Sequence, residues 1–277
     1  TQSRVDFKAT PTCGAGRKTS PSQPHRRSLR KESSQITVIE PPSAWPALNL
    51  GELWKYRDLL ILFVWRDFSA KYRQSVLGVS WAVINPVIQM VLFTLVFGKM
   101  AELPSDGIPY PVFNFAALLP WIYFSGCLTK STTSAVRSSQ LLTKVYFPRL
   151  LLPLANVTNG LIDFGIQLVL LLLLMAWYGI VPTAGAFLLP VFLLMIIVAA
   201  LAVGLWTSAL SVKYRDVTQV ICFMARMWMW LTPVVYSVSL GPEKWRPLYY
   251  LNPMVGVIEG FRWAMLGATS PDWQMMG

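Results

Sequence analysis

Histidine, cysteine and paired acidic residues are scarce in this 277-residue chain, and each scarcity removes a class of function. The only histidine, His25, lies in a tail rich in Ser, Thr, Pro and Arg, which argues against His-based catalysis and His-ligated metals. The three cysteines have no metal-binding spacing and predict neither a zinc site nor a disulfide framework. No Walker motif and no nucleophile paired with a base is present. We therefore expect no catalytic residue, metal or cofactor on this chain.

Charge is missing altogether from residues 164–212, a run of 49 residues without Asp, Glu, Lys, Arg or His. One helix of that length would be about twice as long as a bilayer core is thick. The run therefore predicts two membrane spans joined by a turn, which Gly179, Pro182 and Gly185 mark. Mean hydropathy is +0.48 and only 13% of residues are charged. These values predict an all-α polytopic membrane protein.

Two parts of the chain differ in composition. Residues 1–48 are expected to form a disordered basic tail and a Pro-rich linker, and residues 49–277 a transmembrane domain. Proline is expected to break the first span at Asn85-Pro86. Five spans are predicted, at residues 79–98, 111–129, 153–177, 186–211 and 217–237.

Two further segments are amphipathic. Residues 50–74 predict a helix lying in the membrane interface, because its apolar middle of seven residues is too short to span; the alternative is a short first span. Residues 242–266 are rich in aromatics and interrupted by prolines, which predicts short re-entrant helices on the outer side. The interface helix carries Trp54, Tyr56, Arg57, Trp65, Arg66, Lys71, Tyr72 and Arg73. The external segment carries Trp245, Asn252, Pro253, Glu259 and Arg262.

Basic residues alternate along the connections between spans. Residues 1–78 hold 13 Lys and Arg, residues 130–152 hold four, and residues 213–216 hold two. The other two connections hold one and none. By the positive-inside rule, the N-terminus and the basic connections are cytoplasmic. The net charge of +11 is therefore attributed to membrane topology and anionic lipid, not to nucleic acid.

Two charged residues fall inside predicted spans. Asp163 and Arg226 each lie about ten residues from the cytoplasmic end of a span, roughly 15 Å deep. A lone charge at that depth costs at least about 2.5–3.5 kcal/mol on insertion scales. Matching depth and opposite sign predict a salt bridge between the third and fifth spans, or a wet cavity. The alternative is that each meets water or polar backbone separately.

Aromatic side chains are dense in the second and fifth spans. Sugars stack on aromatic faces, so these residues are candidates to line a glycan channel, while core packing and interfacial anchoring are the commoner roles. The candidates are Trp121, Tyr123, Phe124, Trp228, Trp230 and Tyr236.

Several blocks in order resemble one family, the permease subunits of type-2 ABC exporters that move polysaccharides such as O-antigen, capsule or teichoic acid. The resemblance covers about residues 50–266. The blocks are VLGVSWAVINP at 76–86, LTKVYFPR at 142–149, YRDV at 214–217 and LNPMVGVIEGFR at 251–262.

The resemblance implies a homodimer in the bacterial inner membrane and separate ATPase subunits that bind ATP and Mg²⁺. It implies an interface helix, a cytoplasmic docking segment for the ATPase, and external gate helices. It also implies six spans, whereas only five are visible before Gly277. The expected docking residues are Lys144, Tyr146, Phe147, Pro148 and Arg149, together with Tyr214, Arg215 and Asp216.

The sequence does not identify the cargo. A lipid-linked polysaccharide is the first interpretation, and Lys71, Arg73 and Lys130 are then candidates to meet the anionic pyrophosphate of its lipid carrier. An ABC exporter for another lipid or a drug is an alternative. A membrane-embedded glycosyltransferase would need more external acids than Glu243 and Glu259. A secondary transporter would usually show an internal repeat, and none is evident.

Overall fold

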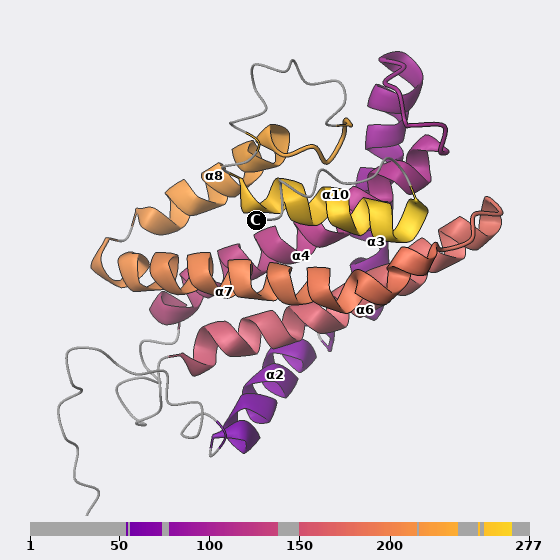
Figure 1. The fold of residues 1–277 in the computed structure, drawn as a ribbon. Helices are drawn as coiled ribbons and strands as arrows, with labels where there is room; N and C mark the ends of the chain where they lie inside the picture. Colours follow the sequence, from indigo (N-terminus) through magenta and orange to yellow (C-terminus); the bar gives the residue numbers. More distant parts are fainter. Residues whose placement is uncertain are drawn as a thin grey trace, which may run out of the picture. The chain divides into compact units, whose positions relative to one another are not determined.

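The computed structural model describes residues 54, 56–73, 78–137, 150–214, 216–237, 249 and 252–267. Every regular element among these residues is helical, as expected (Figure 1). Within these described residues, four helical segments are long and apolar enough to cross a membrane. They are Gly78–Met100, Tyr110–Ser134, Leu151–Trp177 and Ala184–Lys213.

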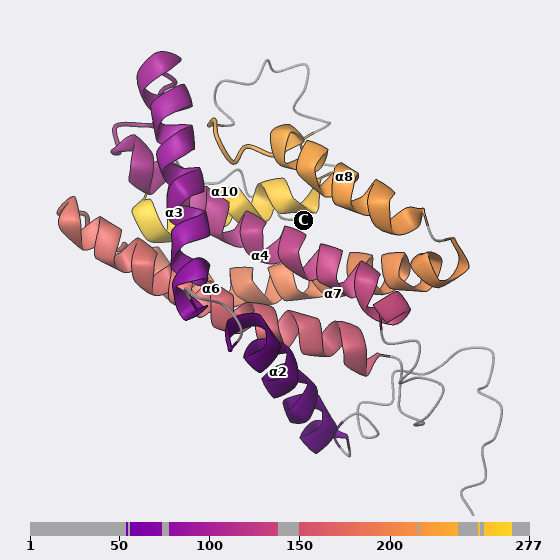
Figure 2. The ribbon, with the colours of Figure 1, turned by 180° about the vertical axis from the view of Figure 1, so that it is seen from behind.

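The centre of the fold is α4 (Tyr110–Arg137). Of its most apolar segment 78% is buried, against 11–28% for the other three candidate spans. It packs against α3, α6, α7, α8 and α10. Figures 1 and 2 show α10 on one face of α4 and α3 on the opposite face. The other spans keep large apolar surfaces exposed, as expected for helices that meet lipid.

The uncharged run forms the predicted hairpin. It consists of α6 (Leu151–Trp177), a short 3-10 turn η3 (Ala184–Leu188) and α7 (Leu189–Lys213). Gly179, at the turn, has a φ of 68°, a left-handed conformation that favours glycine. Helix α6 begins two residues before the predicted span and ends where predicted, whereas α7 begins three residues later and ends two residues later than predicted.

The fifth predicted span is shorter than expected. Helix α8 (Val217–Leu231) has 15 residues, and irregular backbone continues from Thr232 to Ser237. Pro233 accounts for the end, because the residue before a proline is disfavoured in helical geometry. The described part of the chain therefore contains four long candidate spans and one shorter apolar helix, α8.

The predicted break at Asn85-Pro86 is wrong. A 3-10 turn η1 (Gly78–Ser80) leads into α3 (Trp81–Phe93), which continues through Pro86 without interruption. The irregular part is the π-helical segment η2 (Thr94–Met100). A proline removes only one hydrogen bond, and a membrane helix can accommodate that loss.

The predicted interface helix is α2 (Arg57–Tyr72). Its Phe63 packs against Leu151, Leu152 and Ala155 at the start of α6. The opposite side exposes apolar residues, among them Trp65. A charged helix with one face on the protein and exposed apolar side chains elsewhere suits the membrane boundary.

The external segment contains α10 (Pro253–Leu266). Asn252 caps its N-terminus by accepting a hydrogen bond from the Met254 amide, and Pro253 occupies the first turn. Most of the helix is buried against α4, α7 and η3. Helix α10 is thus covered by protein on most of its surface. That this segment dips into the outer leaflet stays a prediction.

Candidate functional site

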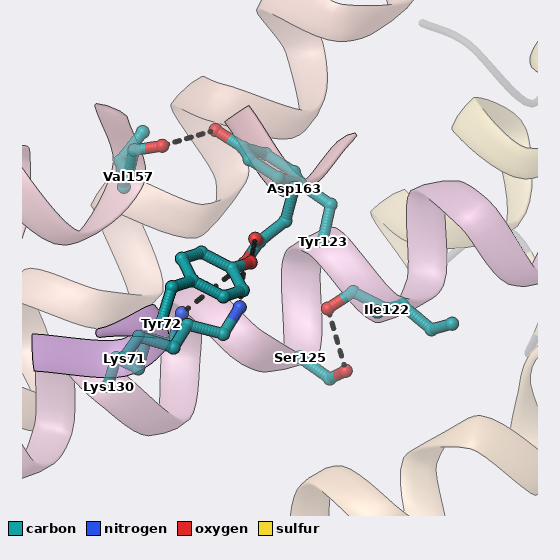
Figure 3. Close-up of polar contacts among 8 residues, drawn as sticks. All are labelled: Lys71, Tyr72, Ile122, Tyr123, Ser125, Lys130, Val157 and Asp163. Atoms are coloured by element: carbon teal, nitrogen blue, oxygen red, sulfur yellow. Dashed lines mark hydrogen bonds and ion pairs between the residues drawn. The ribbon is translucent and has the colours of Figure 1, made fainter. Parts of the chain in front are cut away.

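Asp163 joins three helices. Its Oδ2 lies 2.7 Å from Lys71 Nζ at the end of α2 and 3.8 Å from Lys130 Nζ on α4. Its Oδ1 accepts a 2.5 Å hydrogen bond from the Tyr72 hydroxyl. We call these four residues the Asp163 cluster (Figure 3). One carboxylate thus ties the predicted interface helix to two long apolar helices.

Tyr72 acts in this cluster as a neutral donor. Burial raises the pKa of Tyr72, and the hydrogen bond to the Asp163 carboxylate and its negative charge raise that pKa further. The phenol therefore stays protonated at neutral pH and keeps its hydrogen bond to Asp163. Its side chain is buried, whereas those of Lys71 and Lys130 are 38% and 43% exposed.

The structure does not form the predicted ion pair between Asp163 and Arg226. The carboxylate is satisfied by Lys71 and Tyr72, and Arg226 Nε donates to the carbonyl of Cys222 one turn earlier in α8. Arg226 lies on an exposed face of α8. Asp163 and Arg226 were expected to pair because they have equal predicted depth and opposite charge. Lys71 of α2 lies within ion-pair distance of Asp163 instead.

The ionic partners of Asp163 come from near the ends of their segments. Lys71 is in the last turn of α2, and Lys130 lies four residues before the end of its apolar segment at Ser134. No sequence spacing connects these residues, so the cluster was not predicted. The available signal was that Lys71 and Tyr72 end a helix expected at the membrane boundary.

A second charged group, the Arg262 cluster, lies beneath α10. Arg262 is 1% exposed. Its Nη1 donates to Glu259 Oε1 at 3.0 Å, and its Nη2 donates to the carbonyls of Pro233 and Val234 at 3.1 and 3.3 Å. The guanidinium carbon lies 3.8 Å from the centre of the Phe113 ring on α4. Arg262 therefore clamps α10 to α4 and to the segment that follows α8.

The same segment after α8 is fixed by other hydrogen bonds. The Tyr110 hydroxyl donates to the Val235 carbonyl at 2.7 Å. The amide of Asn252 donates to Thr232 Oγ1 at 3.0 Å. Asn252, Glu259 and Arg262, expected as gate residues, thus all lie at the junction of α10, α4 and α8. Trp245 lies outside the described residues.

The candidate channel aromatics divide into two groups. Trp121, Tyr123 and Phe124 are buried in the core of this chain, where Trp121 and Phe124 pack edge-on against Trp228. The second group lies at the far end of α8 and beyond. Trp230 is 48% exposed, and its ring is tilted by 57° against those of Phe93 and Phe97 at centroid distances of 6.1 and 6.0 Å. Tyr236 is partly buried.

Most of the remaining predicted residues lie at the surface or outside the residues that the structure describes. The docking residues Lys144, Tyr146, Phe147, Pro148, Arg149 and Arg215 lie outside the described residues. Tyr214 is exposed and Asp216 precedes α8. On the interface helix, Trp54, Arg57, Trp65, Arg66, Lys71 and Arg73 are exposed, whereas Tyr56 is partly buried and Tyr72 buried.

No group of His, Cys, Asp and Glu among the described residues is arranged to hold a metal ion. Ionisable side chains form the two clusters above and two ion pairs between sequence neighbours on α2, Arg57 with Asp58 and Arg66 with Asp67. Neither cluster contains a nucleophile beside a base. The contacts shown join helices through ion pairs and hydrogen bonds.

Comparison with known proteins agrees with this picture. Residues 58–266 match the family model described as ABC-2 type transporter. The chain is 35% identical over 224 residues to the "O-antigen export system permease protein RfbA" of Myxococcus xanthus, covering 80% of this chain and 85% of that protein. It is 26% identical to the protein of the same name from Klebsiella pneumoniae, covering 80% and 84%. It is 21% identical to the "Polysialic acid transport protein KpsM" of Escherichia coli, covering 73% and 78%. The chain belongs to the ABC-2 type transporter family.

Proposed function

We propose that this chain is the permease subunit of an exporter for a lipid-linked O-antigen or capsular polysaccharide. The observation that carries the proposal is the match over most of both chains to a relative named as an O-antigen export permease. The helical core, with four long apolar segments, provides the membrane-embedded body such a subunit needs. The predicted location is the bacterial inner membrane, with the N-terminus in the cytoplasm.

ATP is expected to be hydrolysed by a separate subunit, since the family consists of transporters and the sequence contains no Walker motif. Residues 142–149 and 214–216 are proposed to dock that ATPase. Of these, Tyr214 is 52% exposed at the end of α7, where an aromatic side chain is available for an interface.

A second copy of the chain is proposed to complete the translocation path. Helix α8 exposes the charged Arg226 between exposed apolar neighbours, including Phe223 and Trp230. A charge facing lipid at membrane depth is costly, which favours a partner subunit or a wet path at this face. We place Arg226 and Trp230 of α8 on that path and interpret the buried Trp121, Tyr123 and Phe124 as its supporting core.

Copurification from native membranes tests the proposal. Mild solubilisation and capture of this chain should recover an ATPase subunit at a one-to-one ratio. The double variant Tyr146→Ala/Arg149→Ala should release the ATPase and leave the permease folded, because aromatic and Arg anchors dominate interfaces. Recovery of the chain without any ATPase under all mild conditions would sink the exporter proposal.

A further inference from the structure

The Asp163 cluster has more positive than negative charge. Two ammonium groups share one carboxylate oxygen, at 2.7 and 3.8 Å, and the other oxygen is taken by the neutral Tyr72 hydroxyl. With both lysines protonated, the cluster carries a net charge of +1. The single carboxylate offsets only part of the repulsion between the two ammonium groups, so a further anion would be attracted to the cluster.

Hydrogen-bond donors also remain available. Each ammonium group has three donors, and a single carboxylate oxygen cannot accept them all. Within the described part of the chain, neither lysine has an ion pair with any carboxylate other than Asp163. The Asp163 side chain is 18% exposed, whereas both lysine side chains are about twice as accessible. The open donors are therefore on the accessible side of the cluster.

The cluster also lies at a junction of helices. Lys71 arrives from α2, Lys130 from α4 and Asp163 from α6, and Figure 3 shows the two lysine side chains converging on the carboxylate. Basic pockets between membrane helices on the cytoplasmic side characteristically bind phosphate headgroups of lipids. Lysine binds phosphate as a compact point charge.

We propose that Lys71, Lys130 and Tyr72 form a binding site for the phosphate of a lipid headgroup, with Asp163 holding Lys71 and Tyr72 in place. The headgroup can belong to a bulk anionic phospholipid or to a lipid diphosphate that carries a glycan. The second source rests on the proposed function, whereas the phosphate site itself does not. Arg73, the neighbouring cation at the end of α2, has no ion pair with Asp163 among the described residues and is excluded from the site.

A purely structural ion pair is the competing explanation, and substitutions separate the two. Breaking a structural pair from either side has the same consequence. At a phosphate site the two sides act oppositely, because the lysines attract the phosphate and the carboxylate repels it. Asp163→Asn keeps an amide oxygen that can still accept from Lys71 or Tyr72 and removes only the negative charge that repels phosphate. This variant should therefore keep or strengthen lipid binding, while Lys71→Gln and Lys130→Gln should weaken it.

The experiment uses the full-length protein, with its ATPase where that copurifies, in nanodiscs of phosphatidylcholine. The discs contain added phosphatidylglycerol, a polyprenyl diphosphate, or a polyprenol without phosphate, and native mass spectrometry counts the retained lipid over a titration. We expect Lys71→Gln and Lys130→Gln each to weaken phosphate-lipid binding about tenfold. The matched control Arg73→Gln removes the same charge next to the site and should change binding by less than about twofold.

Three outcomes would overturn the site: no preference for phosphate over polyprenol, a loss in Asp163→Asn equal to that in Lys71→Gln, or an equal loss in Arg73→Gln. If Lys71→Gln does not fold, Lys71→Arg keeps the charge and should retain binding, while Lys130→Gln tests the site independently. Equal binding of the two phosphate lipids identifies a phospholipid site. Preference for the diphosphate identifies the carrier of a substrate.

The two proposals fail in different ways. Phosphate-lipid binding that depends on Lys71 and Lys130, in a protein that never captures an ATPase, would remove the exporter function and leave the site. An exporter with its ATPase and no phosphate selectivity at these lysines would remove only the site.

Discussion

The Asp163 cluster and the Arg262 cluster are built from similar charged groups but differ in how completely those groups are satisfied. Arg262 is almost fully buried, and one carboxylate, two carbonyls and an aromatic ring surround it. Lys71 and Lys130 share a single carboxylate oxygen and remain partly exposed. The first arrangement holds helices together, and Arg262 Nε, which has no partner among the described residues, is buried away from any ligand. The second keeps donors and positive charge available for an anion.

The largest effect is expected from Arg262→Leu. Removing the guanidinium leaves Glu259 and two carbonyls without their partner in a buried place, which should lower the free energy of unfolding by about 3–5 kcal/mol. Reversible unfolding in mixed detergent micelles measures this change. The matched control is Arg226→Leu, which removes an exposed arginine. If the two variants lose equal stability, Arg262 is not the clamp described here.

A smaller effect is expected where α4 and α6 approach each other beside the Asp163 cluster. A Cβ atom at Gly160 would lie 2.8 Å from Cys127 Sγ and 3.0 Å from the Tyr123 ring. Gly160→Ala should therefore destabilise the protein by about 1–3 kcal/mol through overpacking. Gly165→Ala has open space around the new methyl group and should stabilise the helix by roughly 0.5–1 kcal/mol. The same unfolding measurement compares them, and the prediction is wrong if both changes have the same sign.

The smallest effect is expected from Tyr72→Phe. This change removes one hydrogen bond to Asp163 and keeps the ring, so stability should fall by about 1 kcal/mol. Tyr214→Phe, at an exposed tyrosine at the end of α7, serves as the control and should change stability by less. Because Tyr72 remains neutral, the difference between the variants should not change between pH 6 and pH 9. A difference that disappears within this range would show that Tyr72 ionises there.

Much of the fold follows from the sequence. The uncharged run predicted the hairpin of α6 and α7, because 49 residues without charge are about twice too long for a single membrane span. A helix, α2, also forms where charges flank a short apolar stretch, while its place at the membrane interface stays a prediction. Local rules were less reliable at prolines: Pro86 leaves α3 intact, whereas the end of α8 coincides with Pro233.

The contacts of the charged residues were not predictable in the same way. Asp163 and Arg226 were each recognised as unusual, since a charge in an apolar segment is visible in the sequence. The partner of Asp163 could not be identified from the sequence, because Lys71 is 92 residues away and is brought close only when α2 packs on α6. Burial of Arg262 likewise depends on the docking of α10 on α4. Such long-range pairings come from tertiary packing, which spacing along the chain does not encode.

The most direct test of the exporter account is transport in inverted inner-membrane vesicles that contain this chain and its ATPase. Lipid-linked glycan should move from the outer, cytoplasmic leaflet into a lumen protected from glycosidase, only when ATP is supplied and only when the chain is present. Protection that proceeds equally in vesicles lacking the chain, or without ATP, would contradict the account.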